Sequence, residues 1–598
     1  MPMMSTSFDF VIIGGGNAGL ALAGRLAENP KVTICVLEMG KDFSDNEDVK
    51  IPGMAATSCG DLSVILVLEA DPRTAQLDAS YQASVSQECI AFIYLQPRAP
   101  SSEYDEFEYS LKAQGWNSKT FLKYFKKSQS LPKEQPKIKT EYVLEPNAEL
   151  YGDGPIVNTL PHFVPAINEH YYKACAAVGV PFNPVGGNGS NSGVWPALSA
   201  IDPKTCTRVS STAYIEPHLN NTNLKVINQA RATRIVFEES ESPLPVVAKA
   251  VAYVQEGIEH PQESIITANK EVILCAGTFH TPQLLEASGE RLAITLHEIM
   301  TLSPNRNHQD HLSTIFLCET DPSIESYDIT LNPEPDVAEL KKHQDDHTHK
   351  SGIFSAVPLS FMYVPFKTFA SAEKISKIKA MVEEATPMTT SIKSPSSLKV
   401  LKKWIADDES YQLEVIMVPH HIPGLPNVTI DSAKKYCFLD IIITHPFSRG
   451  SVHHDPLNPN GPPIVDIGIF ENDIDLEITV EGIKFIRDLI TKPAMSSKNH
   501  GAGVIAISPS PEIGSDEDIK EYARQASFTA YHPVGTASML PREEDGVVDP
   551  NLLVYGTTNL RIVDASIIPV HISAHPMATV YAIAEKVCLR EPSYFVLF

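Results

Sequence analysis

The sequence predicts an α/β protein, in which a doubly wound parallel sheet is joined by an inserted α+β domain with an antiparallel sheet. Three observations predict this fold class. The first is a strand, glycine turn, helix and strand within residues 8–38. The second is a pair of apolar strands much further along the chain, at residues 272–276 and 560–563. The third is a separate pair of strand-like runs, at residues 411–418 and 438–444.

The first unit is a compact βαβ pattern. Residues 8–13 form an apolar strand, residues 20–28 a helix, and residues 32–38 a second strand. This alternation within about 30 residues is typical of parallel pairing with a crossover helix. Near the other end, the strand at 560–563 leads into a helix at 579–588. The region 323–395 is rich in charge, His and Ser, and we expect loops and surface helices there.

Composition excludes several classes of protein. The net charge of −25 disfavours nucleic acids and anionic membranes as partners, since both are polyanions. No run approaches the roughly 20 apolar residues that cross a bilayer, and the first nine residues lack the pattern of a secretory signal. Nine scattered cysteines without a Cys-x-x-Cys pair indicate neither a disulfide framework nor a thiolate zinc site. We therefore expect a cytoplasmic protein whose partners are neither nucleic acids nor membranes.

A glycine-rich fingerprint follows the first strand. Its residues are Gly14-Gly15-Gly16-Asn17-Ala18-Gly19. Gly14 allows the tight turn, Gly16 lets the backbone approach a pyrophosphate, and Gly19 lets the helix pack closely on the strand. Glu38 ends the second strand, where a carboxylate can accept hydrogen bonds from ribose hydroxyls. The fingerprint predicts a bound dinucleotide without a 2′-phosphate, and leaves FAD and NAD open.

Longer motifs are spread over nearly the whole chain. One set near the C-terminus comprises residues 531–539, 546–549, 554–569 and 573–586, and other motifs lie at residues 271–285, 307–311, 448–452 and 463–466. The C-terminal set resembles the C-terminal signature of the glucose–methanol–choline (GMC) oxidoreductase family, residues 271–285 resemble its second signature, and the remaining motifs match further segments of it. The resemblance implies a Rossmann-like FAD-binding domain with an inserted substrate domain, and FAD as the cofactor.

The resemblance also implies roles for individual positions. His532 falls on the catalytic His of the family, and His575 on a second active-site position that is His or Asn. Beside the fingerprint set of Gly14, Gly16, Asn17, Ala18, Gly19 and Glu38, the implied cofactor contacts are Ala230 at the adenine, Asp564 and Ala565 at the ribityl-pyrophosphate arm, and Pro576 and Met577 alongside the isoalloxazine ring.

Two histidines suit the oxidation of an alcohol to a carbonyl. The reaction removes a hydroxyl proton and a carbon-bound hydride. A neutral imidazole can take the proton, and a second imidazole can orient the hydroxyl and the developing alkoxide. We therefore predict that His532 accepts the proton while flavin N5 accepts the hydride. The substrate expected is a small-molecule alcohol, of which a secondary metabolite is one kind.

The expected domains follow from these motifs. Residues 8–310 form the first part of the FAD-binding domain, with family-specific cap and loop insertions at about 60–200. Residues 311–510 form the substrate-binding domain, and residues 511–598 complete the FAD domain and the active site.

The sequence departs from the family in two segments, at residues 62–90 and 290–305. In the first, Ser84-Val85-Ser86-Gln87 stands where the family has Gly-Gly-Ser-Ser, and Glu88 would repel a pyrophosphate. Either flavin binding is weakened, so that a folded protein holds substoichiometric FAD, or the reading frame is mispredicted there. Two alternatives to an alcohol oxidase or dehydrogenase follow: a non-redox lyase or cyclase, and a catalytically inactive homologue.

Overall fold

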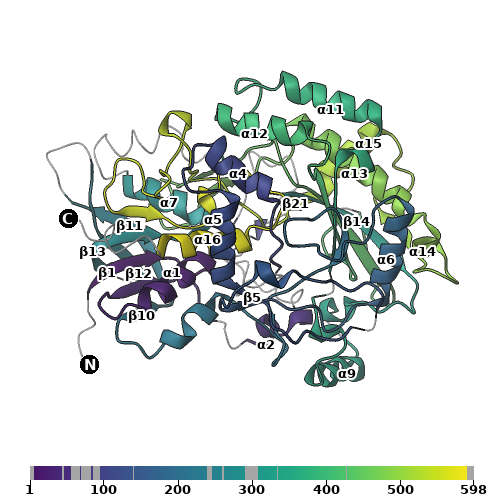
Figure 1. Cartoon of the computed structure of the whole chain (residues 1–598), viewed down its shortest axis with the longest axis horizontal. Helices are drawn as coiled ribbons and strands as arrows, with labels where there is room; N and C mark the ends of the chain where they lie inside the picture. Colours follow the sequence, from purple (N-terminus) through teal and green to yellow (C-terminus); the bar gives the residue numbers. More distant parts are fainter. Residues whose placement is uncertain are drawn as a thin grey trace.

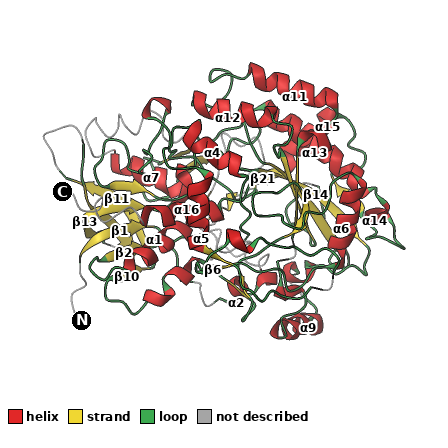
Figure 2. Ribbon diagram, in the orientation of Figure 1, coloured by secondary structure: helices red, strands yellow, loops and turns green. Residues whose placement is uncertain are grey.

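The computed structural model is built around two β-sheets, which lie toward opposite ends of the molecule (Figure 1). Figure 2 shows helices covering both sheets and long loops running between them. The structure describes residues 6–42, 46–54, 67–68, 83–84, 95–138, 140–238, 245–258, 262–289, 307–332, 335–357, 359–425 and 427–588.

The first sheet has seven strands in the spatial order β10-β2-β1-β13-β12-β11, with β22 beside the second half of β13. β10, β2, β1, β13 and β22 run parallel, and β12 and β11 add an antiparallel ribbon. The bounds are Ser7–Ile13 (β1), Ile34–Leu37 (β2), Leu224–Ile227 (β10), Ala230–Phe237 (β11), Ala248–Gln255 (β12), Ser264–Leu274 (β13) and Leu560–Ile562 (β22). This is the parallel, doubly wound sheet that the sequence predicts.

The carboxyl ends of the parallel strands lie at one edge of this sheet. Ile13, Leu37 and Leu274 are in register across β1, β2 and β13, and Ile562 is level with Leu274. Ligands of open α/β sheets bind outside this edge. The fingerprint turn, Glu38 and Asp564 all follow these strand ends directly, so residues more than 500 positions apart are brought to one place.

Helix α16 (Met577–Cys588) packs against both α1 (Asn17–Ala27) and α5 (Ser118–Ser128) beside the first sheet (Figure 1). Small and apolar residues of α1, from Ala18 to Ala27, make this close packing possible. The buried carboxylate of Glu585 on α16 accepts hydrogen bonds from Arg25 at 2.8 Å and from Tyr214 at 3.0 Å. A buried charge that is paired in this way ties α16 to α1.

The second sheet is antiparallel, in the order β15-β16-β17-β14-β20, with β21 also paired to β14. Its bounds are Leu312–Thr320 (β14), Ser360–Val364 (β15), Leu413–Val418 (β16), Lys435–Ile443 (β17), Ile505–Ser508 (β20) and Ser527–Thr529 (β21). The expected antiparallel sheet is thus present, and β21 carries it beyond residue 510.

One expectation within this domain is incomplete. The region 323–395 holds loops and surface helices as expected, but it also contains β15, a fully buried strand. Its residues Ser-Phe-Met-Tyr-Val are apolar enough to pair with β16 and join the core. The composition of the surrounding region concealed this short strand.

The remaining elements surround the two sheets. The other helices are α2 (Glu47–Lys50), α4 (Ser101–Tyr109), α6 (Ala166–Ala177), α7 (Gly277–Gly289), α9 (Val337–Thr348), α10 (Phe366–Phe369), α11 (Ala372–Glu384), α12 (Pro395–Ala406), α13 (Asp473–Ile490), α14 (Pro493–Ser496) and α15 (Asp516–Ala526). The short strands are β3 (Val67–Leu68), β4 (Ala83–Ser84), β5 (Gln129–Ser130), β6 (Ile156–Val157), β7 (Gly193–Pro196), β8 (Ile201–Asp202), β9 (Thr207–Arg208), β18 (Ser451–His453) and β19 (Ile464–Asp466). Within the described ranges, every helix is too short or too polar to span a bilayer.

Candidate active site

The fingerprint turn needs glycine at two positions for steric reasons. Gly14 has φ +104°, and a Cβ atom there would lie 2.2 Å from the carbonyl oxygen of Cys275, which directly follows the neighbouring strand β13. A Cβ atom on Gly19 would lie 1.9 Å from the carbonyl oxygen of Gly14. Both contacts are far shorter than van der Waals distance. The turn therefore closes only without side chains, as the sequence predicts.

The N-terminus of α1 faces the edge of the sheet, and its N-cap residue has no side chain that could cap the first amides. Gly16 is the N-cap residue, in extended conformation. Asn17 and Ala18 follow in the first turn, whose N–H groups have no carbonyl acceptor within the helix. The hydroxyl of Tyr581 on α16 donates to Asn17 Oδ1 at 2.9 Å, so the N-terminal halves of the two helices lie side by side. An anion such as a pyrophosphate suits this position.

Glu38 holds its carboxylate at the same edge. Oε2 accepts the N–H of Gly15 at 2.6 Å, and Oε1 accepts the N–H of Gly40 at 2.5 Å. The side chain is half-buried, so a ribose hydroxyl can still reach it. Ala230 lies beside it, and its N–H donates to the backbone carbonyl of Glu38 at 2.8 Å. The predicted contact between Ala230 and an adenine stays a prediction, and its N–H is already used.

The carboxylate of Asp564 is hydrogen-bonded to other groups of the protein. Its Oδ2 accepts the N–H of Gly277 at 3.0 Å and the hydroxyl of Thr281 at 2.7 Å, while Oδ1 accepts the N–H of Ser566 at 2.9 Å. The carboxylate thus fixes the start of α7 against the loop that contains Ala565. Any contact of this loop with a cofactor would come from its backbone.

Pro576 and Met577 form the start of α16. Both are buried, and the sulfur of Met577 lies 3.8 Å from the side-chain nitrogen of Gln96. Together, the side-chain-free turn, the start of α1 and the Glu38 carboxylate fit a dinucleotide such as FAD. The turn and the first amides of α1 would hold its phosphates, and Glu38 would accept hydrogen bonds from a ribose.

A buried group of histidines lies where the second sheet meets this site. The segment before β14 runs antiparallel to the segment after β21: Ala530 N–H donates to the carbonyl of His311 at 2.9 Å, and Gln309 exchanges backbone bonds with Val534. This pairing places His311 against His532, with 3.0 Å between their Nδ1 atoms. The N–H of His532 also donates to Asp310 Oδ1 at 3.0 Å, which anchors its backbone.

His575 completes the pair that the sequence predicts. Its ring centroid lies 4.1 Å from that of His532, and both residues are buried. Its Nε2 lies 2.9 Å from Oε1 of Glu414, and since a carboxylate only accepts, Nε2–H donates. The ring of Phe361 meets His575 edge-on at 5.2 Å. The 42 residues between positions 532 and 575 are therefore folded so that the two imidazoles lie next to each other.

Glu414 was missed by the sequence reasoning. It is fully buried on β16, opposite Tyr363 of β15. Its Oε2 has no hydrogen-bond partner within the described part of the chain. A single acidic residue inside the apolar run Leu413–Val418 was the available signal, because a buried carboxylate needs a specific partner.

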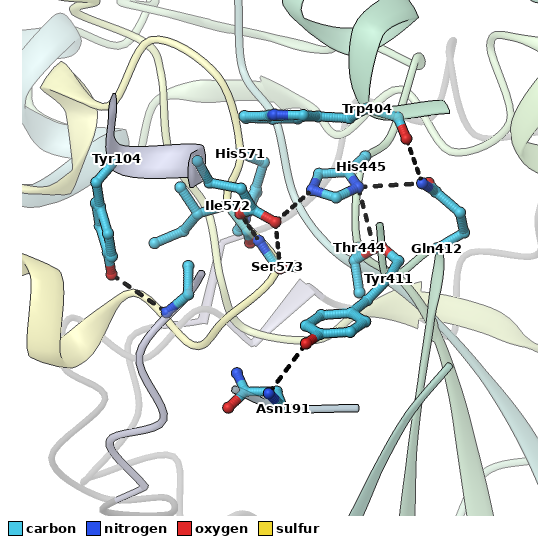
Figure 3. A network of polar contacts seen from close by, with 12 residues as sticks. Tyr104, Asn191, Trp404, Tyr411, Gln412, Thr444, His445, His571, Ile572 and Ser573 are labelled. Atoms are coloured by element: carbon cyan, nitrogen blue, oxygen red, sulfur yellow. Dashed lines mark hydrogen bonds and ion pairs between the residues drawn. The ribbon is translucent and has the colours of Figure 1, made fainter. Parts of the chain in front are cut away.

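A second polar network holds the loop that carries His575. His445 lies beneath the indole of Trp404, with Gln412 and Thr444 at its Nδ1 (Figure 3). Its Nε2 faces Glu103 of α4 at 3.2 Å, and Glu103 also accepts the N–H of Ser573 at 2.7 Å. One carboxylate thus joins α4, the end of β17 and the loop before α16.

Burial keeps the central imidazoles neutral. It lowers the pKa of His532 well below its ordinary 6.5, and the nearby imidazoles of His575 and His571 lower it further. Burial and the same kind of neighbours lower the pKa of His311 well below 6.5, and burial lowers that of His571 to about 3. Burial also raises the pKa of Asp310 to about 7, against its hydrogen bonds.

The comparisons with known proteins agree with this geometry. Residues 93–299 and 446–584 match the two models that describe GMC oxidoreductases. The chain therefore belongs to the GMC oxidoreductase family, as the sequence motifs predict. Membership of this family indicates FAD as the cofactor, which the shape of the dinucleotide turn fits.

Relatives extend over the whole chain. The dehydrogenase mpl7 of Monascus purpureus is 27% identical over 625 residues, covering 98% of this chain and 96% of the relative. An FAD-dependent oxidoreductase from Chaetomium thermophilum has a TM-score of 0.81 at 22% identity, covering 97% of this chain and 98% of that one. A fungal aryl-alcohol oxidase has a TM-score of 0.76 at 23% identity, with 98% of both chains covered. These likenesses in structure confirm the fold.

The two departures from the family lie almost entirely outside the described residues. Of residues 62–90 only the backbones of β3 and β4 are described, and none of residues 290–305. Glu88 is among the residues left out. The expectation of weakened flavin binding stays a prediction.

Proposed function

We propose that this chain is an FAD-dependent oxidoreductase that oxidises an alcohol group of a small molecule to a carbonyl. The observation that supports the proposal is a pair of adjacent buried imidazoles, His532 and His575, of which His575 is hydrogen-bonded to the carboxylate of Glu414. When bound, FAD supplies the acceptor for the hydride that leaves the carbinol carbon. The remaining chemistry belongs to side chains of this protein.

His532 accepts the hydroxyl proton. Its ring is neutral at cellular pH because burial disfavours the imidazolium, so a lone pair is available before the substrate arrives. A base positioned in this way typically contributes about 10²–10⁴-fold to the rate. The alkoxide character that develops on the substrate makes hydride loss from the same carbon favourable.

His575 and Glu414 supply the second half of the site. Because His575 donates Nε2–H to Glu414, its orientation is fixed. The buried carboxylate offers negative charge close to the imidazolium that forms on His532 during the reaction. In a site shielded from water, such fixed charge is worth more than it would be in solution.

The relatives support the alcohol chemistry. One solved structure of the same fold is an aryl-alcohol oxidase, and one relative in sequence is named a dehydrogenase. The aromatic side chains around the pair, Phe361 at His575 and Tyr363 opposite Glu414, favour a substrate with apolar surface next to its hydroxyl.

The test is anaerobic mixing of the purified holoprotein with a panel of primary and secondary alcohols. We expect at least one alcohol to bleach the visible absorbance of the flavin, while its methyl ether, which has no hydroxyl proton, leaves it unchanged. A flavin-containing protein that no alcohol reduces, but that converts a substrate without net redox change, would favour the lyase or cyclase alternative. Absence of any flavin would favour an inactive homologue.

A further inference from the structure

His311 lies directly behind the proposed base and has three polar contacts. Its Nε2 lies 3.0 Å from the carbonyl oxygen of Ile572 and 3.1 Å from that of Thr444. Its Nδ1 lies 3.0 Å from Nδ1 of His532. A carbonyl oxygen only accepts hydrogen bonds, so Nε2 of His311 must carry a hydrogen to satisfy both.

The imidazole of His311 is neutral. It has no exposed surface, and the ring of His571 is stacked on it with 3.6 Å between centroids. A charge on this ring would be buried without water, and among the described residues no carboxylate bonds to the ring to offset that cost. Burial and these neighbours hold its pKa well below the ordinary value. A neutral imidazole carries one hydrogen, so Nδ1 of His311 has a lone pair.

The proton between the two Nδ1 atoms therefore belongs to His532. We propose that His311 is a positioning residue that fixes His532 in the Nδ1–H tautomer and thereby leaves the lone pair on Nε2 for the substrate. The proposal rests on the function of His532 as the base. Without an acceptor at this position, either ring nitrogen of His532 could carry the proton, and only one of the two tautomers could act.

His311 does not relay protons. Its Nε2–H lies between two carbonyl oxygens, neither of which can take a proton and pass it on. The proton that His532 gains at Nε2 consequently stays on that ring until product leaves. The hydrogen bond from His532 to His311 fixes the orientation and the tautomer of the His532 ring. In many functional histidines, a hydrogen bond at one ring nitrogen determines in this way whether the other nitrogen is protonated.

Two substitutions at His311 distinguish the effect of losing the hydrogen-bond acceptor for His532 from the effect of changing the shape of the side chain. His311→Leu removes every hydrogen bond of the ring, whereas His311→Gln offers an amide oxygen to His532 and an amide N–H to the carbonyls. Leaving the buried Nδ1–H of His532 without a partner disfavours the active tautomer, so we expect His311→Leu to slow flavin reduction about 10- to 100-fold. We expect His311→Gln to recover most of that loss.

A matched control lies three residues away. His308 is also fully buried, and neither of its nitrogens has a hydrogen-bond partner among the residues described. His308→Leu makes the same change of shape in the same segment without touching the His532 ring. We expect it to leave the rate of flavin reduction near that of the parent.

Nitrogen NMR of the ¹⁵N-histidine-labelled holoprotein reads the tautomer directly, with the His532 signals identified by their loss in His532→Ala. We expect a protonated Nδ1 and an unprotonated Nε2 in the parent, and loss of this preference in His311→Leu. A protonated Nε2 on His532 in the parent would overturn the proposal, as would an unchanged tautomer in His311→Leu. Full activity of His532→Ala would instead overturn the proposed function.

Discussion

At the carboxyl edge of the first sheet, the site consists mainly of backbone: the glycines of the turn and the first amides of α1. Glu38 adds one carboxylate beside them. At the end of the second sheet, the site is made of side chains: His311, His532 and His575 are buried against Glu414 and one another. The two sites meet around the start of α16, but their residues obey different physical constraints.

The two regions therefore differ in the substitutions that they can tolerate. A turn that a phosphate must approach fails when any side chain is added, because the space is already filled by neighbouring backbone. A group of imidazoles fails when a hydrogen-bond partner is lost, because buried polar atoms cannot turn to water instead. Mutations should therefore damage the first region through volume and the second through hydrogen bonding.

The largest effect is expected at Gly14. Gly14→Ala forces a methyl group against the carbonyl of Cys275 and adds a side chain at φ +104°, so crowding and backbone strain together should cost about 3 kcal/mol or more. We expect loss of flavin and a lower unfolding midpoint in urea. Gly179→Ala is the control, since Gly179 also has positive φ but has open space around it. Equal destabilisation by both substitutions would show that crowding in the turn is unimportant.

A smaller effect is expected at Glu414. Glu414→Leu leaves the Nε2–H of His575 buried without an acceptor, which should cost about 1–3 kcal/mol and slow flavin reduction about tenfold or more. Glu414→Gln keeps an acceptor in place and should retain more of the activity. The rates come from anaerobic single-turnover mixing. If the Leu variant proves as fast as the Gln variant, the carboxylate does not position His575.

The smallest effect concerns pH and His308. Burial lowers the pKa of this imidazole to about 4, below the unfolded value of about 6.5. Between these values the unfolded chain binds a proton that the folded chain does not, so the stability of the parent falls as the pH falls below 6.5. At about pH 5.5 this loss is roughly 1 kcal/mol.

His308→Leu removes that loss. Urea unfolding at about pH 7.5 and pH 5.5 should show a variant that gains about 1 kcal/mol relative to the parent on going to the lower pH. The same difference between variant and parent at both pH values would mean that His308 is able to take up a proton in the folded protein.

The parts of this molecule that sequence predicts well are local. The βαβ unit of residues 8–38 was predicted because its strand, turn and helix signals follow one another, and the glycine positions have steric causes within one turn. The family motifs located His532 and His575 as well. β13 begins at Ser264, eight residues before the predicted strand, because its first half is stabilised by the β12 ribbon rather than by an apolar sequence.

The parts that sequence reasoning missed depend on tertiary contacts. Nothing near His311 in the chain indicates that its ring will meet His532, which lies 221 residues later. Glu103 is one of several acidic residues of α4, and although Glu414 interrupts an apolar run, the sequence does not indicate that its partner is His575. That Asp564 lies along the cofactor stays a prediction; what sequence reasoning missed is that its carboxylate fixes α7, because the loop brings it within hydrogen-bond distance of Gly277 and Thr281.

The central claim is that one region holds the cofactor and the other handles the proton, and a crossed comparison of Gly16→Val and His532→Ala tests it most directly. The measurement is the flavin-to-protein ratio, together with the rate of anaerobic flavin reduction by an alcohol. We expect Gly16→Val to lose the flavin, because its side chain blocks the approach of the pyrophosphate. We expect His532→Ala to keep the parental ratio and to slow reduction by about 10²-fold or more. A Gly16→Val protein with full flavin, or a His532→Ala protein that either loses flavin or reduces it at the parental rate, would contradict the account.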